Sequence, residues 1–308
     1  MSAPLLRLGT RRSPLALAQA EETRARLCAA HGWAADAVEL VPVTASGDKV
    51  QDRPLADIGG KALWTRELDA WLEERRIDAA VHSLKDVETI RPEWLTIGAV
   101  LPRADKRDVL VGAASLAALP QGAVIGTSAP RRAAQVLHAR PDCHVVTYRG
   151  NVGTRLAKIA AGEVDATFLA AAGLQRLGQG GTGHPLDARN WLPAPAQGAI
   201  GVECRCDDAA TREWLGAIDD LPTRAEVTAE RALLAALGGS CHSPIAVLSE
   251  VAGEMLAMRA ALFSPDGAER VDGEATFRAE EEAGPARLAA DLLARATPGI
   301  AAHFAGAR

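Results

Sequence analysis

Short apolar runs alternate with helix-like segments over the first two thirds of the chain, and this alternation limits the fold more than any other feature. The run LLRLGT (5–10) indicates a strand, a helical pattern follows from about Pro14 to Ala30, and VELVPVT (38–44) indicates the next strand. Strands that alternate with helices favour parallel sheets, because each helix returns the chain to the end of the sheet where the next strand starts. We therefore predict parallel α/β sheets.

The alternation continues beyond these first elements. In ALWTRELDAWLEERR (62–76), Trp64, Leu68, Trp71 and Leu72 recur at helical spacing, which predicts an amphipathic helix with its aromatic side chains in the core. Further short strands are predicted at DAAVHS (78–83), LTIGAVL (95–101), DVLVG (108–112), AVIGT (123–127), HVVTY (144–148), DATFLA (165–170) and AIGVE (199–203). The polar segment DKVQDRPLADIGGK (48–61) is either a mobile loop or an exposed connection.

The pattern changes near residue 220. A helix predicted around 225–237 is followed by three apolar runs, IAVLSEV (245–251), MLAMRAALFS (255–264) and AERVDGEATF (268–277). Turn residues such as Pro265-Asp266-Gly267 separate these runs, which indicates an antiparallel meander. With a last helix near 279–296, this part is predicted to be a small α+β domain.

Composition excludes several classes of protein. The 308 residues suffice for about two domains, and the net charge of −5 argues against nucleic acid or an anionic membrane as the main partner. No apolar run approaches membrane-spanning length, and the N-terminal residues lack the apolar core of a signal peptide, so we expect a cytoplasmic protein. The five cysteines form no disulfide pattern, and we expect no metal site.

Arginines cluster at three junctions between a predicted strand and a helix. They lie in LGTRRSPLALAQA (Arg11 and Arg12), VIGTSAPRRAAQ (Arg131 and Arg132) and YRGNVGTRLAKI (Arg149 and Arg155). Ser13 is expected to cap the first helix, and Thr127 or Ser128 the second. Solvated arginines are common, but guanidinium groups beside free helix N–H groups suit carboxylates. Three such junctions at one edge of parallel sheets favour a polyanionic ligand.

Two further positions allow more than one interpretation. Lys85-Asp86 follows the predicted strand DAAVHS; the pair is either a surface ion pair or a group that stabilises positive charge at the ligand edge. In ALGGSCHSPIA (236–246), Cys241 lies in a turn of small residues. It is either a structural cysteine or a thiol presented for covalent chemistry.

The order of several motifs resembles the porphobilinogen deaminase family. The motifs are TRRSPLALAQA, GGKALWTREL, AAVHSLKDV, GTSAPRR, RGNVGTRL, LAAAGLQRLG, PAPAQGAIGVECR and LGGSCHSPIA, which together cover residues 7–246. In that family, four porphobilinogen molecules are joined head to tail, with loss of ammonia, into hydroxymethylbilane. The primer is a dipyrromethane cofactor held by a thioether to one cysteine.

The resemblance implies roles for individual residues. Cys241 matches the cofactor-bearing cysteine, and Asp86 matches the catalytic aspartate, which would oppose the azafulvenium-like cation left when ammonia departs. Each pyrrole carries an acetate and a propionate, which accounts for the arginines. Implied catalytic residues are Asp86 and Lys85; implied cofactor-binding residues are Cys241, Lys85, Ser128, Arg131, Arg132 and Ser240. Implied substrate-binding residues are Arg11, Ser13, Thr127, Arg149, Arg155 and Arg176.

The resemblance also implies an architecture. It consists of two similar α/β domains, like those of periplasmic binding proteins, around a cleft, plus a small C-terminal α+β domain with a three-stranded antiparallel sheet. The implied boundaries are 1–99 with 200–218 for domain 1, 100–199 for domain 2 and 219–308 for domain 3, and we expect a monomer. The chain departs from the commonest family form at Ala62, Trp64, Ala129 and Pro130, and KDVE lacks the usual proline after valine. None of these changes removes a reactive group.

Two other functions fit parts of the pattern. A non-catalytic two-domain module that binds a polycarboxylate would share the arginines, but it would need neither Asp86 nor a thiol in a loop. A cysteine acyltransferase or hydrolase would use Cys241 with a base such as His242. An adjacent histidine is poorly placed for that role, and no third group that would orient it is evident.

Overall fold

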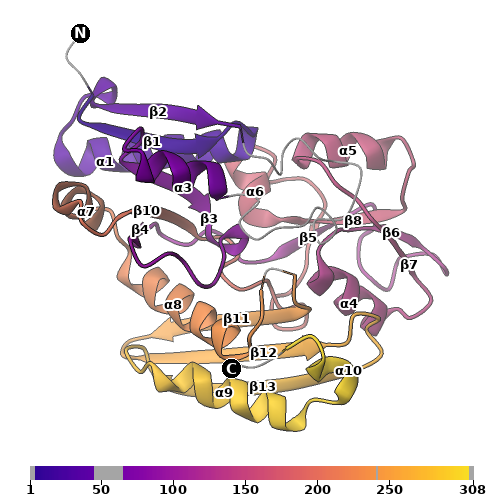
Figure 1. The fold of residues 1–308 in the computed structure, drawn as a ribbon. Helices are drawn as coiled ribbons and strands as arrows, with labels where there is room; N and C mark the ends of the chain where they lie inside the picture. Colours follow the sequence, from indigo (N-terminus) through magenta and orange to yellow (C-terminus); the bar gives the residue numbers. More distant parts are fainter. Residues whose placement is uncertain (1–3, 45–64, 241, 305–308) are drawn as a thin grey trace. The chain divides into compact units, whose positions relative to one another are not determined.

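The computed structural model describes residues 4–44, 65–240 and 242–304 (Figure 1). The predicted loop 48–61, the departures at Ala62 and Trp64, and Cys241 lie outside these residues. The chain forms two compact units: the described residues up to 103 belong to the first together with 199–224, and residues 104–198 belong to the second together with those from 225 onwards. The three-domain division of the sequence stays a prediction.

The first unit contains a five-stranded sheet in the order β2-β1-β3-β10-β4. Its strands are β1 (Leu6–Arg11), β2 (Val38–Val43), β3 (Ala79–Ser83), β4 (Leu95–Val100) and β10 (Ile200–Arg205). β1 is parallel to β2 and β3, but β10 is antiparallel to β3 and β4. The prediction of parallel pairing therefore holds for β2, β1 and β3 but not for β10, which joins the sheet after the long excursion through residues 104–198.

Helices cover both faces of this sheet. They are α1 (Pro14–His31), α3 (Arg66–Glu73) and α7 (Ala209–Gly216). Successive strand residues point to opposite faces. In β3, accordingly, Ala79 and Val81 share a core with residues of α1 and α7, whereas Ala80 packs with residues of α3.

Helix α1 begins and ends where the sequence predicts. Ser13 accepts a hydrogen bond from the Ala16 N–H (3.3 Å), and Pro14 occupies the first helical position. At the other end, Gly32 adopts φ 66°, a left-handed conformation that glycine tolerates and that ends the helix. Described residues of the predicted helix 62–76 form α3 over a shorter range.

The second unit contains another five-stranded sheet, in the order β7-β6-β8-β5-β9. Its strands are β5 (Asp108–Val111), β6 (Val124–Gly126), β7 (His144–Val146), β8 (Ala166–Ala170) and β9 (His184–Pro185). β6 is parallel to β7 and β8, and β5 is antiparallel to its two neighbours. Each five-stranded sheet thus has three adjacent parallel strands and one antiparallel strand in the fourth position.

Three helices cover the second sheet. They are α4 (Pro130–Ala139), α5 (Val152–Ala160) and α6 (Ala171–Arg176). Leu110 and Ile125 share a core with α4, while Val109 and Leu169 share a core with α5 and α6 on the other face.

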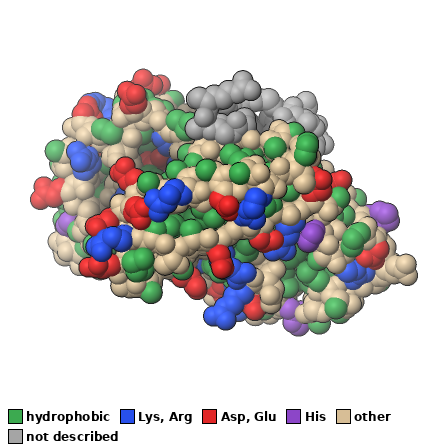
Figure 2. All heavy atoms as spheres, turned by 90° about the horizontal axis from the view of Figure 1, so that it is seen from below, with side chains coloured by type: hydrophobic (Ala, Val, Ile, Leu, Met, Phe, Trp, Pro, Cys, Tyr) green, Lys and Arg blue, Asp and Glu red, His purple; other side chains and the backbone are tan. Residues whose placement is uncertain are grey.

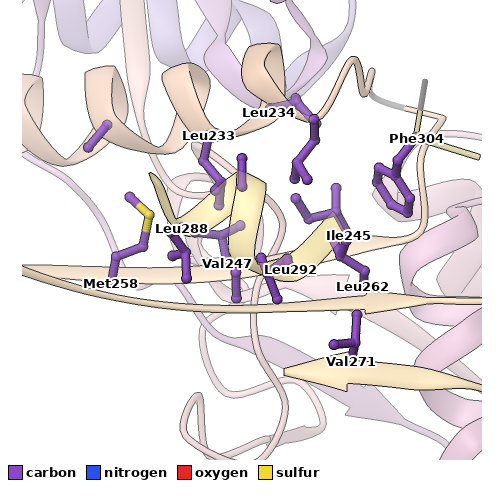
Figure 3. Packing of buried hydrophobic residues seen from close by; sticks show 14 of the residues in the cluster. Leu233, Leu234, Ile245, Val247, Met258, Leu262, Val271, Leu288, Leu292 and Phe304 are labelled. Atoms are coloured by element: carbon purple, nitrogen blue, oxygen red, sulfur yellow. The ribbon is translucent and has the colours of Figure 1, made fainter. Parts of the chain in front are cut away.

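A three-stranded antiparallel meander completes the second unit, as the sequence predicts. Its strands are β11 (Ile245–Ala252), β12 (Met255–Phe263) and β13 (Arg270–Arg278). Helices α8 (Leu221–Ala236), α9 (Ala283–Arg295) and α10 (Pro298–Ala301) belong to the same part of the chain. Figure 3 shows Leu233 of α8, Val247 and Met258 of the sheet, and Leu288 and Leu292 of α9 in one apolar core.

The opposite face of the meander packs on α4, since Ala134 shares a cluster with Ala261 and Phe263. The turn after β12 contacts the same helix: Gly267 (φ 71°) accepts a hydrogen bond at its carbonyl from the His138 ring (2.9 Å), and a Cβ on this glycine would lie 2.5 Å from the Ala134 carbonyl oxygen. Helix α8 starts earlier than predicted, because the Asp220 carboxylate accepts a hydrogen bond from the Thr223 N–H (2.9 Å).

These elements confirm the predicted fold class, with two α/β sheets and a C-terminal α+β part. Among the described residues, no helix combines the length and apolar character needed to cross a membrane.

Candidate active site

In the first unit, four predicted site residues follow the carboxyl ends of two neighbouring strands. Arg11 is the last residue of β1, Ser13 caps α1, and Lys85 and Asp86 form the short helix η3 (Leu84–Asp86) directly after β3. β1 and β3 are parallel and paired, with Gly9 opposite Ala80, so their carboxyl ends lie at the same edge of the sheet. The structure therefore brings these four partly exposed residues to one edge.

The turn that carries Lys85 and Asp86 is fixed by its neighbours. The Leu84 N–H donates to the Ala199 carbonyl (3.1 Å), and the Gln19 amide donates to the Ser83 hydroxyl (2.7 Å). The Leu84 side chain is buried against Gly201, where an added Cβ would lie 2.3 Å from a Leu84 methyl group. Asp86 thus follows a strand paired on both sides and a packed anchor residue.

A buried ion network lies just beyond this turn in the sequence. Arg91 Nε and Nη2 donate to the two oxygens of Glu203 (both 2.9 Å), and its Nη2 donates to Asp69 (2.6 Å). Arg91 Nη1 also contacts Glu88 (3.1 Å). Burial disfavours the charged guanidinium, but the hydrogen bonds with Asp69 and Glu203 outweigh this effect and raise the pKa of Arg91. The sequence did not single out this network.

His82 lies beside the same network. Its Nε2 is 3.3 Å from a Glu203 oxygen, and its side chain is almost fully buried. Burial lowers the pKa of His82, which keeps the imidazole neutral, although the charge of Glu203 acts in the opposite direction.

In the second unit, the predicted residues again follow adjacent parallel strands. Thr127 and Ser128 follow β6, Arg149 follows β7, and Arg176 ends the helix that follows β8. Because β7, β6 and β8 are parallel neighbours, the segments that carry these residues all leave the same edge of the second sheet. The predicted placement of these residues after the carboxyl ends of parallel strands thus holds within each unit.

The predicted hydroxyl cap of α4 was wrong. Ala129 occupies the N-cap position and makes no side-chain hydrogen bond. Thr127 Oγ1 instead accepts from the Ala129 N–H (3.2 Å), and Ser128 Oγ accepts from the Tyr148 N–H (3.0 Å). Pro130 is the first helical residue, so the N-cap position falls on Ala129, one residue after Ser128. Ser128 thereby connects the turn after β6 to the turn after β7.

Arg131 and Arg132 lie in the first turn of α4, as predicted, but they are buried. Arg131 Nη1 lies 2.8 Å from one Asp108 oxygen, and Arg132 Nη2 lies 2.7 Å from the other. Two guanidinium groups share one carboxylate, so the cluster keeps one unit of positive charge. Neither Nε has a hydrogen-bond partner among the described residues. This arrangement fits a further anionic group, such as a carboxylate.

Two of the remaining predicted arginines donate hydrogen bonds to backbone oxygens. Arg155 Nε donates to the Gly150 carbonyl (3.0 Å), and Arg176 Nη2 donates to the Gly198 carbonyl (3.2 Å). The Tyr148 hydroxyl donates to the Arg155 carbonyl (2.9 Å). Arg149, Arg155 and Arg176 are each partly exposed.

The loop of Cys241 joins α8 to β11. Ser240 is exposed; its N–H donates to Ser243 Oγ (3.0 Å), and its hydroxyl accepts from the His242 N–H (3.2 Å). Gly239 packs on Leu234, since an added Cβ there would lie 2.6 Å from a Leu234 methyl group. The described residues on either side of Cys241 therefore form a compact turn.

Within the described ranges, no three His, Cys, Asp or Glu residues are grouped so that they could hold a metal ion.

Comparisons with known proteins identify the family of the chain. The family model for the porphobilinogen deaminase dipyromethane cofactor binding domain matches residues 6–213, and that for the porphobilinogen deaminase C-terminal domain matches 224–294. The porphobilinogen deaminase of Sphingopyxis alaskensis is 57% identical over 307 residues, covering 97% of this chain and 96% of the relative. That of Paracoccus denitrificans is 51% identical over 295 residues, covering 94% of each.

Solved structures show a more distant likeness. The VFT2 domain of Bordetella pertussis BvgS is 16% identical, with a TM-score of 0.40, over 69% of this chain and 84% of that one. Shigella flexneri YhfZ is 17% identical, with a TM-score of 0.36, over 75% and 95%. These values carry no inference about function. The two family matches and the identities to curated relatives establish that the chain belongs to the porphobilinogen deaminase family.

Proposed function

We propose that this chain joins four porphobilinogen molecules head to tail, with release of ammonia, into hydroxymethylbilane. It is a deaminating transferase of tetrapyrrole and haem biosynthesis that uses a dipyrromethane cofactor. The observation that carries this conclusion is the match to a domain defined by binding that cofactor, together with the C-terminal domain, over residues 6–213 and 224–294.

Cys241 is our proposed attachment point of the cofactor, through a thioether. Its sequence neighbours support this role, because small residues on a turn leave a thiol sterically open. The bound dipyrromethane would supply the pyrrole carbon to which new units are joined. Ser240, Ser128, Arg131, Arg132 and Lys85 are proposed to bind it. The positive charge and the unpaired Nε atoms at Arg131 and Arg132 support a carboxylate there.

Asp86 is our proposed catalytic residue. Loss of ammonia from porphobilinogen leaves positive charge on the substrate, and a fixed carboxylate lowers the energy of that charge. Asp86 is partly exposed, and the backbone just before it is held by the hydrogen bond of Leu84, so the residue is accessible and follows a fixed turn. Lys85, its neighbour in the same turn, is proposed to bind a substrate or cofactor carboxylate and so orient the reacting pyrrole.

The substrate carboxylates are proposed to bind at Arg11, Ser13, Thr127, Arg149, Arg155 and Arg176. Support comes from the first four, which lie at or just beyond the carboxyl ends of strands, where α/β proteins bind ligands. Arg155 and Arg176 lie in the helices that follow β7 and β8. Acidic and basic side chains are interspersed on the face drawn in Figure 2, which is unlike a nucleic-acid-binding surface. We further propose that the protein acts as a monomer in the cytoplasm, without a nucleic-acid or membrane partner.

Replacement of Asp86 tests the proposed mechanism. Asp86→Asn keeps the shape of the side chain but removes its charge, so we expect porphobilinogen consumption to slow by about 10²–10³-fold. Asp86→Glu keeps the charge at a displaced position and should retain more activity. Asp207→Asn, at an exposed site, is the matched control and should behave like the wild type. Equal rates for Asp86→Asn and the wild type would reduce Asp86 to a surface charge.

A further inference from the structure

Asp108 is the hub of the buried arginine cluster in the second unit. It is the first residue of β5 and has no exposed surface. Its Oδ1 accepts from Arg132 Nη2 (2.7 Å) and the Gln197 amide (2.9 Å). Its Oδ2 lies 2.8 Å from Arg131 Nη1 and accepts from the Trp191 indole (2.9 Å). Four donors thus occupy the acceptor sites of one carboxylate.

The arginines are held on their other sides as well. Arg131 Nη1 donates to the Leu192 carbonyl (3.0 Å), and Arg132 Nη1 donates to the Phe168 carbonyl (2.9 Å). The Phe168 ring stacks on Trp191, with ring centroids 4.7 Å apart, and Trp191 in turn binds Asp108. Asp108 therefore connects α4, β8 and the segment 191–197 through a closed set of contacts.

The charges of this cluster do not cancel. Burial disfavours ionisation, but the charges of Arg131 and Arg132 outweigh it and hold the pKa of Asp108 well below its usual range. Burial lowers the pKa of Arg131, and the charge of Arg132 acts in the same direction while Asp108 opposes them. Two side-by-side guanidiniums repel each other, and one carboxylate compensates only one of the two charges.

We propose that Asp108 is a positioning residue for the cofactor. It holds Arg131 and Arg132 in one orientation and cancels one of their two charges, so that the pair accepts one further carboxylate. This inference rests on the proposed role of these arginines in binding the dipyrromethane. Asp108 itself touches neither substrate nor cofactor in this account.

The experiment measures the rate at which the cofactor is assembled on the protein, in addition to turnover of porphobilinogen. Full-length wild type and Asp108→Asn are produced in cells that lack porphobilinogen, and porphobilinogen is then added to the purified proteins. Intact mass spectrometry measures how fast two linked pyrrole units appear on the chain. We expect Asp108→Asn to incorporate them at least about tenfold more slowly, because its arginines lose a charge-assisted hydrogen-bond acceptor. Asp108→Glu restores the charge at a displaced position and should be intermediate.

Leu110→Ala separates positioning from stability. Leu110 is a buried residue of the same strand, and its truncation weakens the core without removing an atom from the arginine cluster. Thermal unfolding of all variants is measured alongside. We expect Leu110→Ala to incorporate pyrrole units at the wild-type rate despite its lower melting temperature.

Each outcome decides one claim. The positioning role would be overturned if Asp108→Asn incorporated pyrrole units at the wild-type rate. It would also be overturned if Leu110→Ala lost as much melting temperature as Asp108→Asn and was slowed equally. If Asp108→Asn does not fold, Asp108→Glu decides in the same way, with a wild-type rate contradicting the proposal. Failure of the wild type to gain any pyrrole unit would instead overturn the proposed function.

Discussion

Arg91 offers a sharp test of how the first unit is stabilised. Its side chain is 10% exposed and pairs with Asp69, Glu88 and Glu203, and the side chain of Glu203 is 1% exposed. Arg91→Met keeps most of the side-chain volume but leaves these carboxylates without their cation. Removing one partner of a buried ion pair costs about 3–5 kcal/mol, so we expect a loss of this size in the free energy of unfolding at pH 7.

Urea unfolding followed by circular dichroism measures this loss. Burial raises the pKa of Asp69, although Arg91 acts in the opposite direction, so removal of Arg91 makes protonation of this carboxylate easier still. The loss should therefore shrink as the pH falls toward 5. Arg75→Met is the matched control: its ion pair with Asp207 is more than half exposed and should contribute little. A loss below about 1 kcal/mol for Arg91→Met at pH 7 would show that the Arg91 network does not stabilise the first unit.

Two further predictions concern titration and chain growth. Burial lowers the pKa of His82 from 6.5, so below that pH the unfolded state binds more protons than the folded state. The free energy of unfolding should therefore decrease as the pH is lowered below 6.5, by at most about 1.4 kcal/mol per pH unit. Unfolding measured across pH 5–8 should show this slope in the wild type and a flatter one in His82→Gln; equal slopes would contradict it. Arg131→Leu or Arg132→Leu should impair cofactor assembly, whereas Arg11→Leu and Arg155→Leu should carry the cofactor but accumulate enzyme with one to three added pyrroles. Native mass spectrometry counts these species, and identical distributions in all four variants would favour a uniform electrostatic attraction.

The sequence was informative where a local pattern decides the structure. Strand β3 and the position of Lys85-Asp86 after it follow from an apolar run and its end, and the start of α1 follows from Ser13 and Pro14. The three-stranded meander follows from its turn residues. Such features depend on residues that are close in the chain.

Long-range features could not be predicted in the same way. Apolar periodicity does not give the direction of a strand, so the antiparallel entry of β10 was missed. The contact of Arg91 with Glu203 spans 112 residues, and that of Asp108 with Trp191 spans 83. The only hint of Asp108 was a charged residue at the start of an apolar run. The hydroxyl cap of α4 was predicted wrongly because Pro130 occupies the first helical position. This makes Ala129 the N-cap, although hydroxyl side chains are generally preferred there.

Intact mass measurement with peptide mapping decides whether the cofactor is attached to Cys241. The described cysteines differ in reactivity: Cys143 and Cys204 are buried, and burial raises the pKa of Cys204 to about 11, so neither is a good nucleophile. Cys206 is exposed and is the stronger competitor. We expect a mass above that of the sequence by two linked pyrrole units, an adduct that maps to Cys241, and no adduct on folded Cys241→Ser. Active protein with unmodified Cys241, or an adduct on Cys206, would contradict it.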